Sequence, residues 1–595
     1  MFSLVSSSLV VGLALQVAAF PSSSRKLERR NGTEPYSLPY LCVNATERNA
    51  AIQVKRDTFL YGPSIAGNTS FYPTGSLGSS IVQADVNAFT ADGASQRQAV
   101  GEGQQIAAAT TRAAGGIKQL SDFELLYKDQ WQKAIPDGIA TGILTNYTDD
   151  LFFSMSRLSV YPYSIVRLDP AKDVLEFEVE DSVVASITGG NTLSELFTSG
   201  ALFYADHRSQ DSLEKIPGRF AATCDAYFYI HPTSGDFLPL AVRTNVGSNL
   251  IYTPADLPND WLLAKMAFNL NDFWDSQWYH FAATHHVVEL VYEAAFRSLS
   301  DDHPVMAILQ RLTPQLFAMR QVAIQTLLSK NGFIDQLFAS TGAAAGVSTT
   351  QHYHAGAGKF QANYFIKNLE ARNLINSFGP ELKHFPFLED ATPIHASIQK
   401  FITSFVESYY TSPKDFAKDT ELQAWISEAV PAKIFDFPTS VDKDTLIDIL
   451  THVAFLGSAA HHTMNTNDIS EAAATLPLTP VSLYKPLPST KGVTDLIPFL
   501  PNVTQAIGQI SVVALFARPN FIGSEKCLVQ MFNGTAMLGR MNEDVGEAAK
   551  EFAEEMLEQS EVVSSKAFDA DGLSQGMPFI WRALDPQRAP YFLTI

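Results

Sequence analysis

The chain has 595 residues, of which 46% are hydrophobic and 17% charged, so it is a globular protein with a large core and not a disordered one. Its formal net charge is −20, and the mature part has no lysine- or arginine-rich run. This balance argues against nucleic acid and anionic membranes as partners. The three cysteines, Cys42, Cys224 and Cys527, allow at most one intramolecular disulfide bond, which excludes a disulfide-framework protein.

The N-terminus is typical of a secreted protein. Residues 1–19 are predicted to be a signal peptide, because their apolar segment is too short to span a membrane and Val17 and Ala19 suit the small-residue cleavage rule. Residues 20–50 are predicted to be a pro-segment or a surface arm. The basic pair Arg29-Arg30 suggests a dibasic cleavage site, and a solvated tail is an equally good interpretation.

Sequons for N-linked glycosylation support an extracellular location. No other stretch is long and apolar enough for a transmembrane helix, so no membrane anchor is expected. The six sequons start at Asn31, Asn44, Asn68, Asn146, Asn502 and Asn533.

The first half of the chain mixes irregular, helical and strand-like patterns. Residues 36–80 are rich in Pro, Gly, Asn and Ser and are expected to be irregular. Residues 83–131 are expected to form helices that break near Gly115-Gly116. The β-branched and aromatic runs at 175–187 and 226–245 predict short strands, and the second run contains a hairpin turn at Ser234-Gly235-Asp236.

The second half is predicted to be helical almost throughout, except for a low-complexity, Gly/Ala-rich loop at 340–358. No internal repeat or linker divides residues 51–595, which favours one dominant helical domain with a minor β portion. The candidate helices lie near 304–330, 395–411, 442–466, 503–516 and 543–562, after a long helix that starts near Trp261.

That long apolar helix carries the main chemical signal. His280, His285 and His286 lie on it, and buried imidazoles cost free energy unless something binds them, so they indicate a metal site. His280 and His285 point about 140° apart on an ideal helix, so they can share a metal only across a widened π turn. His286 is an alternative ligand, and Glu289 can orient His285 from one turn away.

Two further features of the second half of the chain stand out beside the first helix. His461 and Asn465 lie one turn apart on the predicted helix 442–466, although this spacing alone favours residues that cap a helix end. The chain ends at Ile595 in an apolar, aromatic-rich segment that is expected to be buried, whereas an ordinary terminus is frayed.

Taken together, these motifs resemble the lipoxygenase family. If the sequence is matched to the family pattern from Trp261 without a gap, the ligands fall on Phe281 and His286, but phenylalanine cannot bind a metal. The family spacing His-x3-Thr-His instead fits His280 and His285. The resembling segments are WLLAK at 261–265, Asp272, His280-x3-Thr284-His285, Glu289, His303-Pro304, Ser458-x2-His461-x3-Asn465 and the terminal Ile595.

The resemblance implies a mainly α, lipoxygenase-type catalytic domain over 51–595 without the N-terminal β-barrel lipid-binding domain of the plant and animal members. It implies a dioxygenase that adds O2 to polyunsaturated fatty acids such as linoleate and linolenate, after a metal(III)-hydroxide takes a hydrogen atom from a bis-allylic carbon. The implied ligands are His280, His285, His461, Asn465 and the Ile595 carboxylate. Similarity to secreted fungal members implies one manganese, with iron as the alternative.

Two residues are candidates for the substrate pocket. Ala323 falls where the family directs the position and face of oxygen addition, although a helix-core alanine is equally plausible. Arg518 is a candidate tether for the fatty acid carboxylate, and the alternative is a partner for a helix dipole.

Two other functions stay open at this point, a secreted zinc hydrolase and a non-catalytic lipid-binding protein. The HExxH order is missing, which disfavours the zinc enzyme. His352 and His354 lie in the predicted flexible loop and are expected to take no part in a metal site. A monomer is expected.

Overall fold

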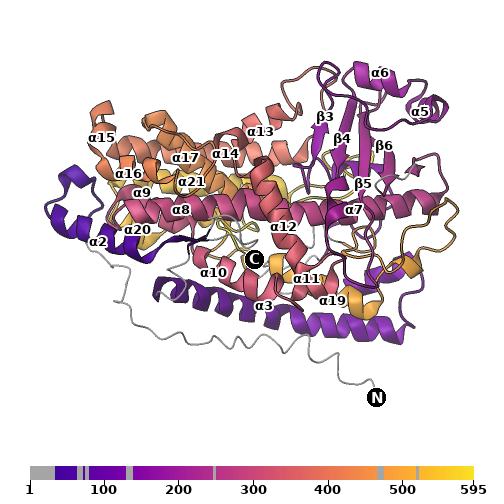
Figure 1. Cartoon of the computed structure of the whole chain (residues 1–595), viewed down its shortest axis with the longest axis horizontal. Coiled ribbons are helices and arrows are strands. Elements are labelled where there is room, and N and C mark those ends of the chain that lie inside the picture. The colour runs from indigo at the N-terminus through magenta and orange to yellow at the C-terminus, as the bar shows by residue number, and fades with distance from the viewer. Residues whose placement is uncertain are drawn as a thin grey trace.

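The computed structural model describes residues 34–594 except for 63–71, 74–79, 129–137, 246–249, 466–474 and 518–520. Helices dominate, and a small sheet lies at one end (Figure 1), which confirms the predicted fold class. The helices are α2 (Ala45–Thr58), α3 (Ser80–Ala113), α4 (Asp150–Met155), α5 (Asp181–Thr188), α6 (Leu193–Thr198), α7 (Pro258–His280), α8 (Val287–Ser298), α9 (Pro304–Leu312), α10 (Leu316–Val322), α11 (Phe333–Leu337), α12 (Gly342–His352), α13 (Phe365–Ala371), α14 (Pro386–Tyr409), α15 (Pro413–Lys418), α16 (Thr420–Glu428), α17 (Lys443–Phe455), α18 (His461–Met464), α19 (Val503–Ala517), α20 (Thr535–Leu538) and α21 (Glu543–Ser564).

The main sheet is antiparallel and has helices on both faces. Side chains alternate along its strands, so Phe228 joins the main core beside α7 while Tyr227 joins a second core with residues of α5 and α6. The strand order follows the chain: β3 (Ile165–Arg167), β4 (Leu202–Asp206), β5 (Cys224–Ile230), β6 (Phe237–Thr244) and β7 (Ile251–Tyr252). Among the described residues the only other strands are the pair β1 (Tyr61–Gly62) and β2 (Tyr72–Pro73), so this part of the chain contains no β-barrel.

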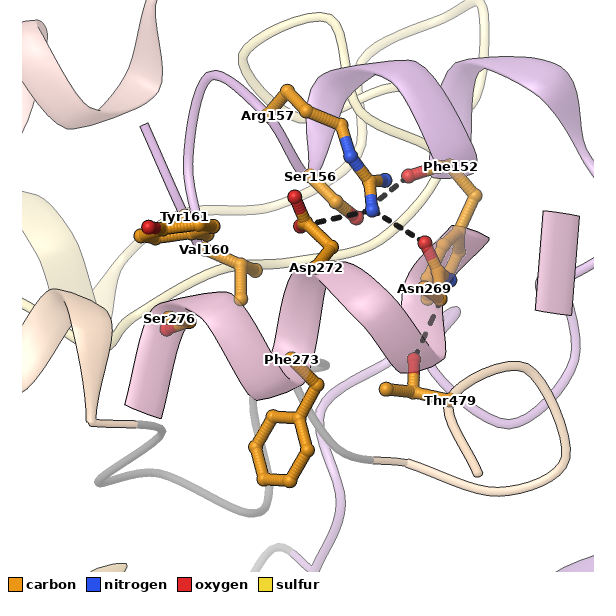
Figure 2. A pocket seen from close by; sticks show the side chains of 10 residues that line it. All are labelled: Phe152, Ser156, Arg157, Val160, Tyr161, Asn269, Asp272, Phe273, Ser276 and Thr479. Atoms are coloured by element: carbon orange, nitrogen blue, oxygen red, sulfur yellow. Dashed lines mark hydrogen bonds and ion pairs between the residues drawn. The ribbon is translucent and has the colours of Figure 1, made fainter. Parts of the chain in front are cut away.

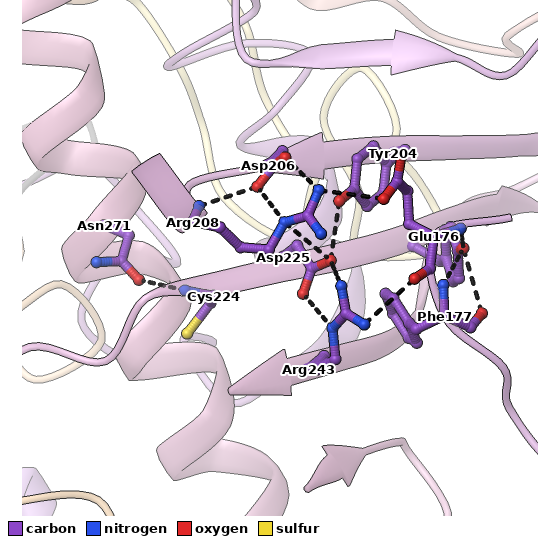
Figure 3. Close-up of polar contacts among 10 residues, drawn as sticks. Glu176, Phe177, Tyr204, Asp206, Arg208, Cys224, Asp225, Arg243 and Asn271 are labelled. Carbon is purple, nitrogen blue, oxygen red and sulfur yellow. Dashed lines mark hydrogen bonds and ion pairs between the residues drawn. The ribbon is translucent and has the colours of Figure 1, made fainter. Parts of the chain in front are cut away.

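A cluster of charged and polar side chains links strands β4, β5 and β6 near one end of the sheet (Figure 3). The buried carboxylate of Asp225 accepts from Arg243 at 2.5 and 2.9 Å and from the hydroxyl of Tyr204 at 2.8 Å. Next to it, the backbone N–H of Cys224 donates to Asn271 of α7 at 3.0 Å. The sheet is thereby fastened to α7, the helix that carries the first histidines.

α7, a π turn at Phe281–His286 and α8 follow one another without interruption and run through the middle of the molecule (Figure 1). Nearly every side chain of α7 and α8 is buried, as expected for a helix that is apolar on all sides. A second continuous helix consists of α17, a π turn at Leu456–Ala460 and α18, and the two π turns contact each other.

Several predicted elements are confirmed. α3 ends just before Gly115 and Gly116, whose φ angles of 98° and 81° are left-handed conformations that terminate a helix. The hairpin predicted at 226–245 is formed by β5 and β6, with Gly235 at a φ of 73° in its turn. The candidate helices of the second half correspond to α9 and α10, α14, α17 and α18, α19, and α21.

The strand predicted at 175–187 is wrong. Residues 181–188 form α5, and the residues before it do not join the sheet. The ring of Phe177 stacks on Tyr227 with 4.2 Å between the centroids, and the hydroxyl of Tyr227 accepts the backbone N–H groups of Glu176 and Phe177. A side chain of the sheet thus satisfies backbone groups that a neighbouring strand would otherwise pair.

The loop predicted at 340–358 is also wrong, because most of it is α12. Its first turn is capped by the side chain of Thr341, which accepts from the N–H of Ala344. A Cβ atom on Gly342 would lie within 3 Å of the backbone of Leu328. The small residues of this stretch therefore reflect close packing and not flexibility.

The irregular arm predicted at 36–80 instead contains α2, which packs on α8. Arg48 of this helix is buried and pairs with Glu421 of α16 at 2.5 Å. All three cysteines are free thiols. Within the described part of the chain, no helix has both the length and the apolar character needed to cross a membrane.

Candidate metal centre

The structure brings together three of the predicted ligands. His280, His285 and His461 each offer a ring nitrogen, and these three nitrogens lie within 4.8 Å of one another. The Nε2 atoms of His285 and His461 are 2.9 Å apart. All three rings are buried, and within the described residues this is the only group with metal-ligand composition and spacing.

The π turns place these rings on a common side. In a π turn the backbone bonds reach one residue further than in an α-helix, and a carbonyl oxygen is left for another donor. The hydroxyl of Thr284 donates to the carbonyl of His280 at 2.7 Å, and that of Ser458 donates to Ala454 at 2.6 Å. The predicted π turn between His280 and His285 is confirmed, and in each of the two turns a hydroxyl donates to a backbone carbonyl.

Burial keeps the three imidazoles neutral. It lowers the pKa of His280 to about 3 and lowers the pKa values of His285 and His461 well below their usual range, and repulsion from neighbouring imidazoles acts in the same direction for all three. Neutral imidazole is the form that binds a metal, since one ring nitrogen then carries a free lone pair.

Hydrogen bonds to the other ring nitrogens orient two of the rings. Nδ1 of His280 lies 3.2 Å from the carbonyl oxygen of Ser276, which can only accept, so Nδ1 carries the proton. Nε2 of His280 is then left with its lone pair, and it has no hydrogen-bond partner among the described residues. This arrangement is usual for metal-binding histidines.

His462, which the sequence interpretation did not include, orients His461. Its Nε2 lies 3.2 Å from the carbonyl oxygen of Phe592, so in the neutral ring Nε2 donates and Nδ1 accepts. The Nδ1 atoms of His461 and His462 are 3.3 Å apart, so His461 donates from Nδ1 and keeps its lone pair on Nε2, facing His285. The only sequence signal for this role was the position of His462 directly after His461. Its other hydrogen-bond partner, Phe592, lies far away in the C-terminal segment.

The remaining predicted ligands lie near the end of the chain and of α18. Asn465 follows α18 and is buried, and its backbone N–H donates to the carbonyl of His461 at 2.9 Å. Ile595 lies outside the described residues. Thr594 is only 1% exposed, so the chain is already buried one residue before its end.

The other candidate residues are distributed as follows. Glu289 and His286 are buried on or next to the first helix, and neither belongs to the three-histidine group. Ala323 is buried at the start of a third π turn, Ala323–Leu327. Arg518 lies outside the described residues.

The two histidines expected to take no part in the site lie outside the three-histidine group. His352 contacts Asp275 at 3.2 Å, and the ring of His354 packs against Phe435.

A buried polar cluster holds the middle of α7 in place (Figure 2). Arg157 donates to Asp272 at 2.9 Å and also to Asn269, while Nε2 of His207 lies 3.0 Å from Asp272. A cavity of about 20 Å³ is lined both by this cluster and by Ser276, the residue whose carbonyl orients His280. Asp272, part of the motif recognised in the sequence, therefore positions the helix.

The predicted glycosylation sites differ in exposure. Asn44, Asn502 and Asn533 are exposed, whereas Asn146 is half-buried and its side-chain nitrogen donates to the carbonyl of Pro578 at 2.7 Å. Asn31 and Asn68 lie outside the described residues.

Comparison with known proteins agrees with this geometry. The lipoxygenase family model matches residues 238–564. A manganese lipoxygenase of Fusarium oxysporum is 45% identical over 553 residues, which cover 92% of this chain and 90% of that protein. One of Colletotrichum gloeosporioides is 44% identical over 566 residues, covering 94% and 93%. The solved structure of a manganese lipoxygenase of Gaeumannomyces graminis has a TM-score of 0.90 and 43% identity, covering 94% of this chain and 100% of that chain. The fold, the paired π turns and these matches together show that the chain belongs to the lipoxygenase family.

Proposed function

We propose that the chain is a manganese-dependent dioxygenase that converts polyunsaturated fatty acids such as linoleate and linolenate to hydroperoxides. The observation that carries this proposal is the group of three buried, neutral imidazoles that two π turns hold together in a member of the lipoxygenase family. The near-full-length relatives named as manganese lipoxygenases support manganese over iron.

The donor set fits a redox-active divalent metal. His280, His285 and His461 supply nitrogen ligands, and we propose that Asn465 and the Ile595 carboxylate supply oxygen ligands. Mixed nitrogen and oxygen donors without thiolate suit manganese and iron. The buried Nε2 of His280, which has no partner among the described residues, is the kind of atom that a bound metal would satisfy.

When bound, the metal would supply the one-electron chemistry that removes a hydrogen atom from a bis-allylic carbon, so that O2 can add to the resulting radical. The residues of the chain hold the imidazole lone pairs in place, through Ser276 for His280 and through His462 for His461. Burial of the three rings excludes bulk water from the site.

The substrate residues and the cellular location are also proposals. We propose that Ala323 lies along the fatty acid chain and directs oxygen addition, and its burial at a π turn is compatible with this role. Arg518 is proposed to bind the carboxylate. We propose that the protein is secreted and glycosylated, which the apolar N-terminal segment and the sequons support, and that it is a monomer.

The adjacent residues His285 and His286 provide a matched test. Purified wild-type protein and the variants His285→Ala and His286→Ala are incubated with linoleate, and conjugated-diene absorbance and oxygen uptake are recorded. We expect both signals for the wild type and for His286→Ala, and the loss of both for His285→Ala. Diene formation that survives in His285→Ala would overturn the assignment of the site.

The same assay separates the two other functions. A zinc hydrolase would contain zinc and consume no oxygen, and a lipid-binding protein would bind linoleate without any change in diene absorbance. Neither function is supported by the relatives found.

A further inference from the structure

A second cavity is lined in part by Phe592, the residue whose carbonyl oxygen accepts from His462. Its volume is about 680 Å³, within the roughly 300–1,000 Å³ range of small-molecule sites. α9, the loop after it, the segment 525–540 and the C-terminal residues Tyr591 and Phe592 form its walls, and none of the three clustered histidines lines it.

Arg311 is the distinctive polar group of this cavity. Its Nε donates to the carbonyl of Met531 at 2.9 Å, one Nη atom donates to the carbonyl of Gln530, and the guanidinium lies 4.3 Å from the ring centre of Tyr591. No carboxylate of the described residues forms an ion pair with it, and Glu525 acts on it only from a distance. Burial lowers its pKa, as expected for a cation that is partly removed from water.

Three other charged side chains of the lining are already paired, whereas Glu525 has no ion pair among the described residues. Lys526 lies 2.6 Å from Asp92, Arg540 lies 2.6 Å from Asp302, and Asp301 lies 3.0 Å from Lys55. Arg311 therefore remains the cation that an entering anion would meet with least competition. A carboxylate is the group that a guanidinium binds best, through two parallel hydrogen bonds.

The rest of the lining suits an apolar body attached to that carboxylate. Ala307, Pro314, Ala536 and Met537 contribute aliphatic surface, and Tyr591 and Phe592 contribute ring surface. A molecule with one acidic end and a hydrocarbon chain matches this distribution. An occupant would also contact Phe592, whose carbonyl oxygen accepts from His462.

We propose that this cavity is a second binding site for a fatty acid, with the carboxylate on Arg311 and the hydrocarbon chain against Tyr591, Phe592 and Met537. The choice of a fatty acid among acidic amphiphiles rests on the proposed function. The site is separate from the three-histidine group and touches the C-terminal segment whose Phe592 carbonyl accepts from His462.

The test uses a saturated fatty acid with a diazirine at the end of its chain, which cannot be oxidised as a substrate because it has no bis-allylic carbon. The intact protein is treated with an endoglycosidase, so that a glycan on Asn533 does not cover the rim. It is then illuminated with the probe, and labelled peptides are identified by mass spectrometry. We expect labels in the segments 525–540 and 588–594, and none there with the methyl ester of the probe.

Two pairs of variants assign the binding. Arg311→Gln should weaken labelling of these segments about ten- to hundredfold, whereas Arg311→Lys keeps the charge and should retain most of it. Gly534→Leu should block labelling with Arg311 intact, because a Cβ atom at Gly534 would already lie 3.4 Å from Cδ of Arg311. Gly546→Leu on α21, with nothing within 4 Å of the added Cβ, is the control.

Thermal unfolding of each variant confirms that it is folded before labelling is compared. Wild-type labelling absent from both segments, or unchanged in Arg311→Gln and Gly534→Leu, would overturn the proposal. Diene formation from linoleate is measured on the same samples. Diene formation without labelling would reject the second site and keep the proposed function, and labelling without diene formation would do the opposite.

Discussion

The hydrogen bonds of His462 allow a quantitative prediction about metal binding. His462→Phe keeps a ring of similar size but removes the acceptor for Nδ1 of His461 and the donor to the carbonyl of Phe592. Each lost bond is worth about 0.5–1.5 kcal/mol, which together corresponds to roughly a 10- to 100-fold loss of metal affinity. The variant should fold, because phenylalanine nearly conserves the volume of the ring at this buried position.

The assay is a titration of the metal-free protein with Mn²⁺ in the presence of a chelator that buffers the free ion. His452→Phe on α17 is the matched control, because His452 is also buried but its Nε2 has no hydrogen-bond partner among the described residues. We expect weaker Mn²⁺ binding for His462→Phe and wild-type binding for His452→Phe. Equal affinities for all three proteins would refute the orienting role of His462.

Three further predictions concern stability. Arg157→Met should lower the free energy of unfolding by about 3–5 kcal/mol, because the buried carboxylate of Asp272 loses its guanidinium partner and keeps only His207. The loss is measured as a lower denaturation midpoint, and Arg157→Met/Asp272→Leu should recover part of it. Arg48→Met should expose residues 34–62 to limited proteolysis while diene formation persists, since it breaks a buried ion pair that fastens α2; cleavage at the wild-type rate would contradict this. Burial acts to raise the pKa of Asp275, but the two neighbouring histidines outweigh it and hold the pKa at about 2. A depressed carboxyl pKa stabilises the fold above its unfolded value near pH 4, so on the order of 2 kcal/mol should be lost between pH 4 and 2, and Asp275→Asn should flatten that part of the stability curve measured by denaturant titration.

The sequence predicted the two histidine helices because their chemistry is local. Three histidines close together on one apolar helix are costly to bury without a metal, and the five-residue step from His280 to His285 required a π turn that the structure contains. The hairpin and the end of α3 were predictable for the same reason, since glycines at left-handed positions determine both.

The features that sequence reasoning missed depend on partners far away in the chain. His462 orients His461 only because Phe592, 130 residues later, places a carbonyl against it. The run at 175–187 has strand-like composition, but Tyr227 satisfies the backbone groups at its start and Gly189 ends the helix that follows. The glycines and alanines of α12 allow the helix to pack closely against its neighbours. No local sequence pattern distinguishes this use of small residues from a flexible loop.

Metal analysis of the purified protein, combined with the linoleate assay, tests the central claim most directly. The account predicts about one manganese per chain, as a single mononuclear site requires, and loss of both manganese and diene formation in His461→Ala. Zinc in place of manganese, or manganese that remains fully bound in His461→Ala, would contradict it.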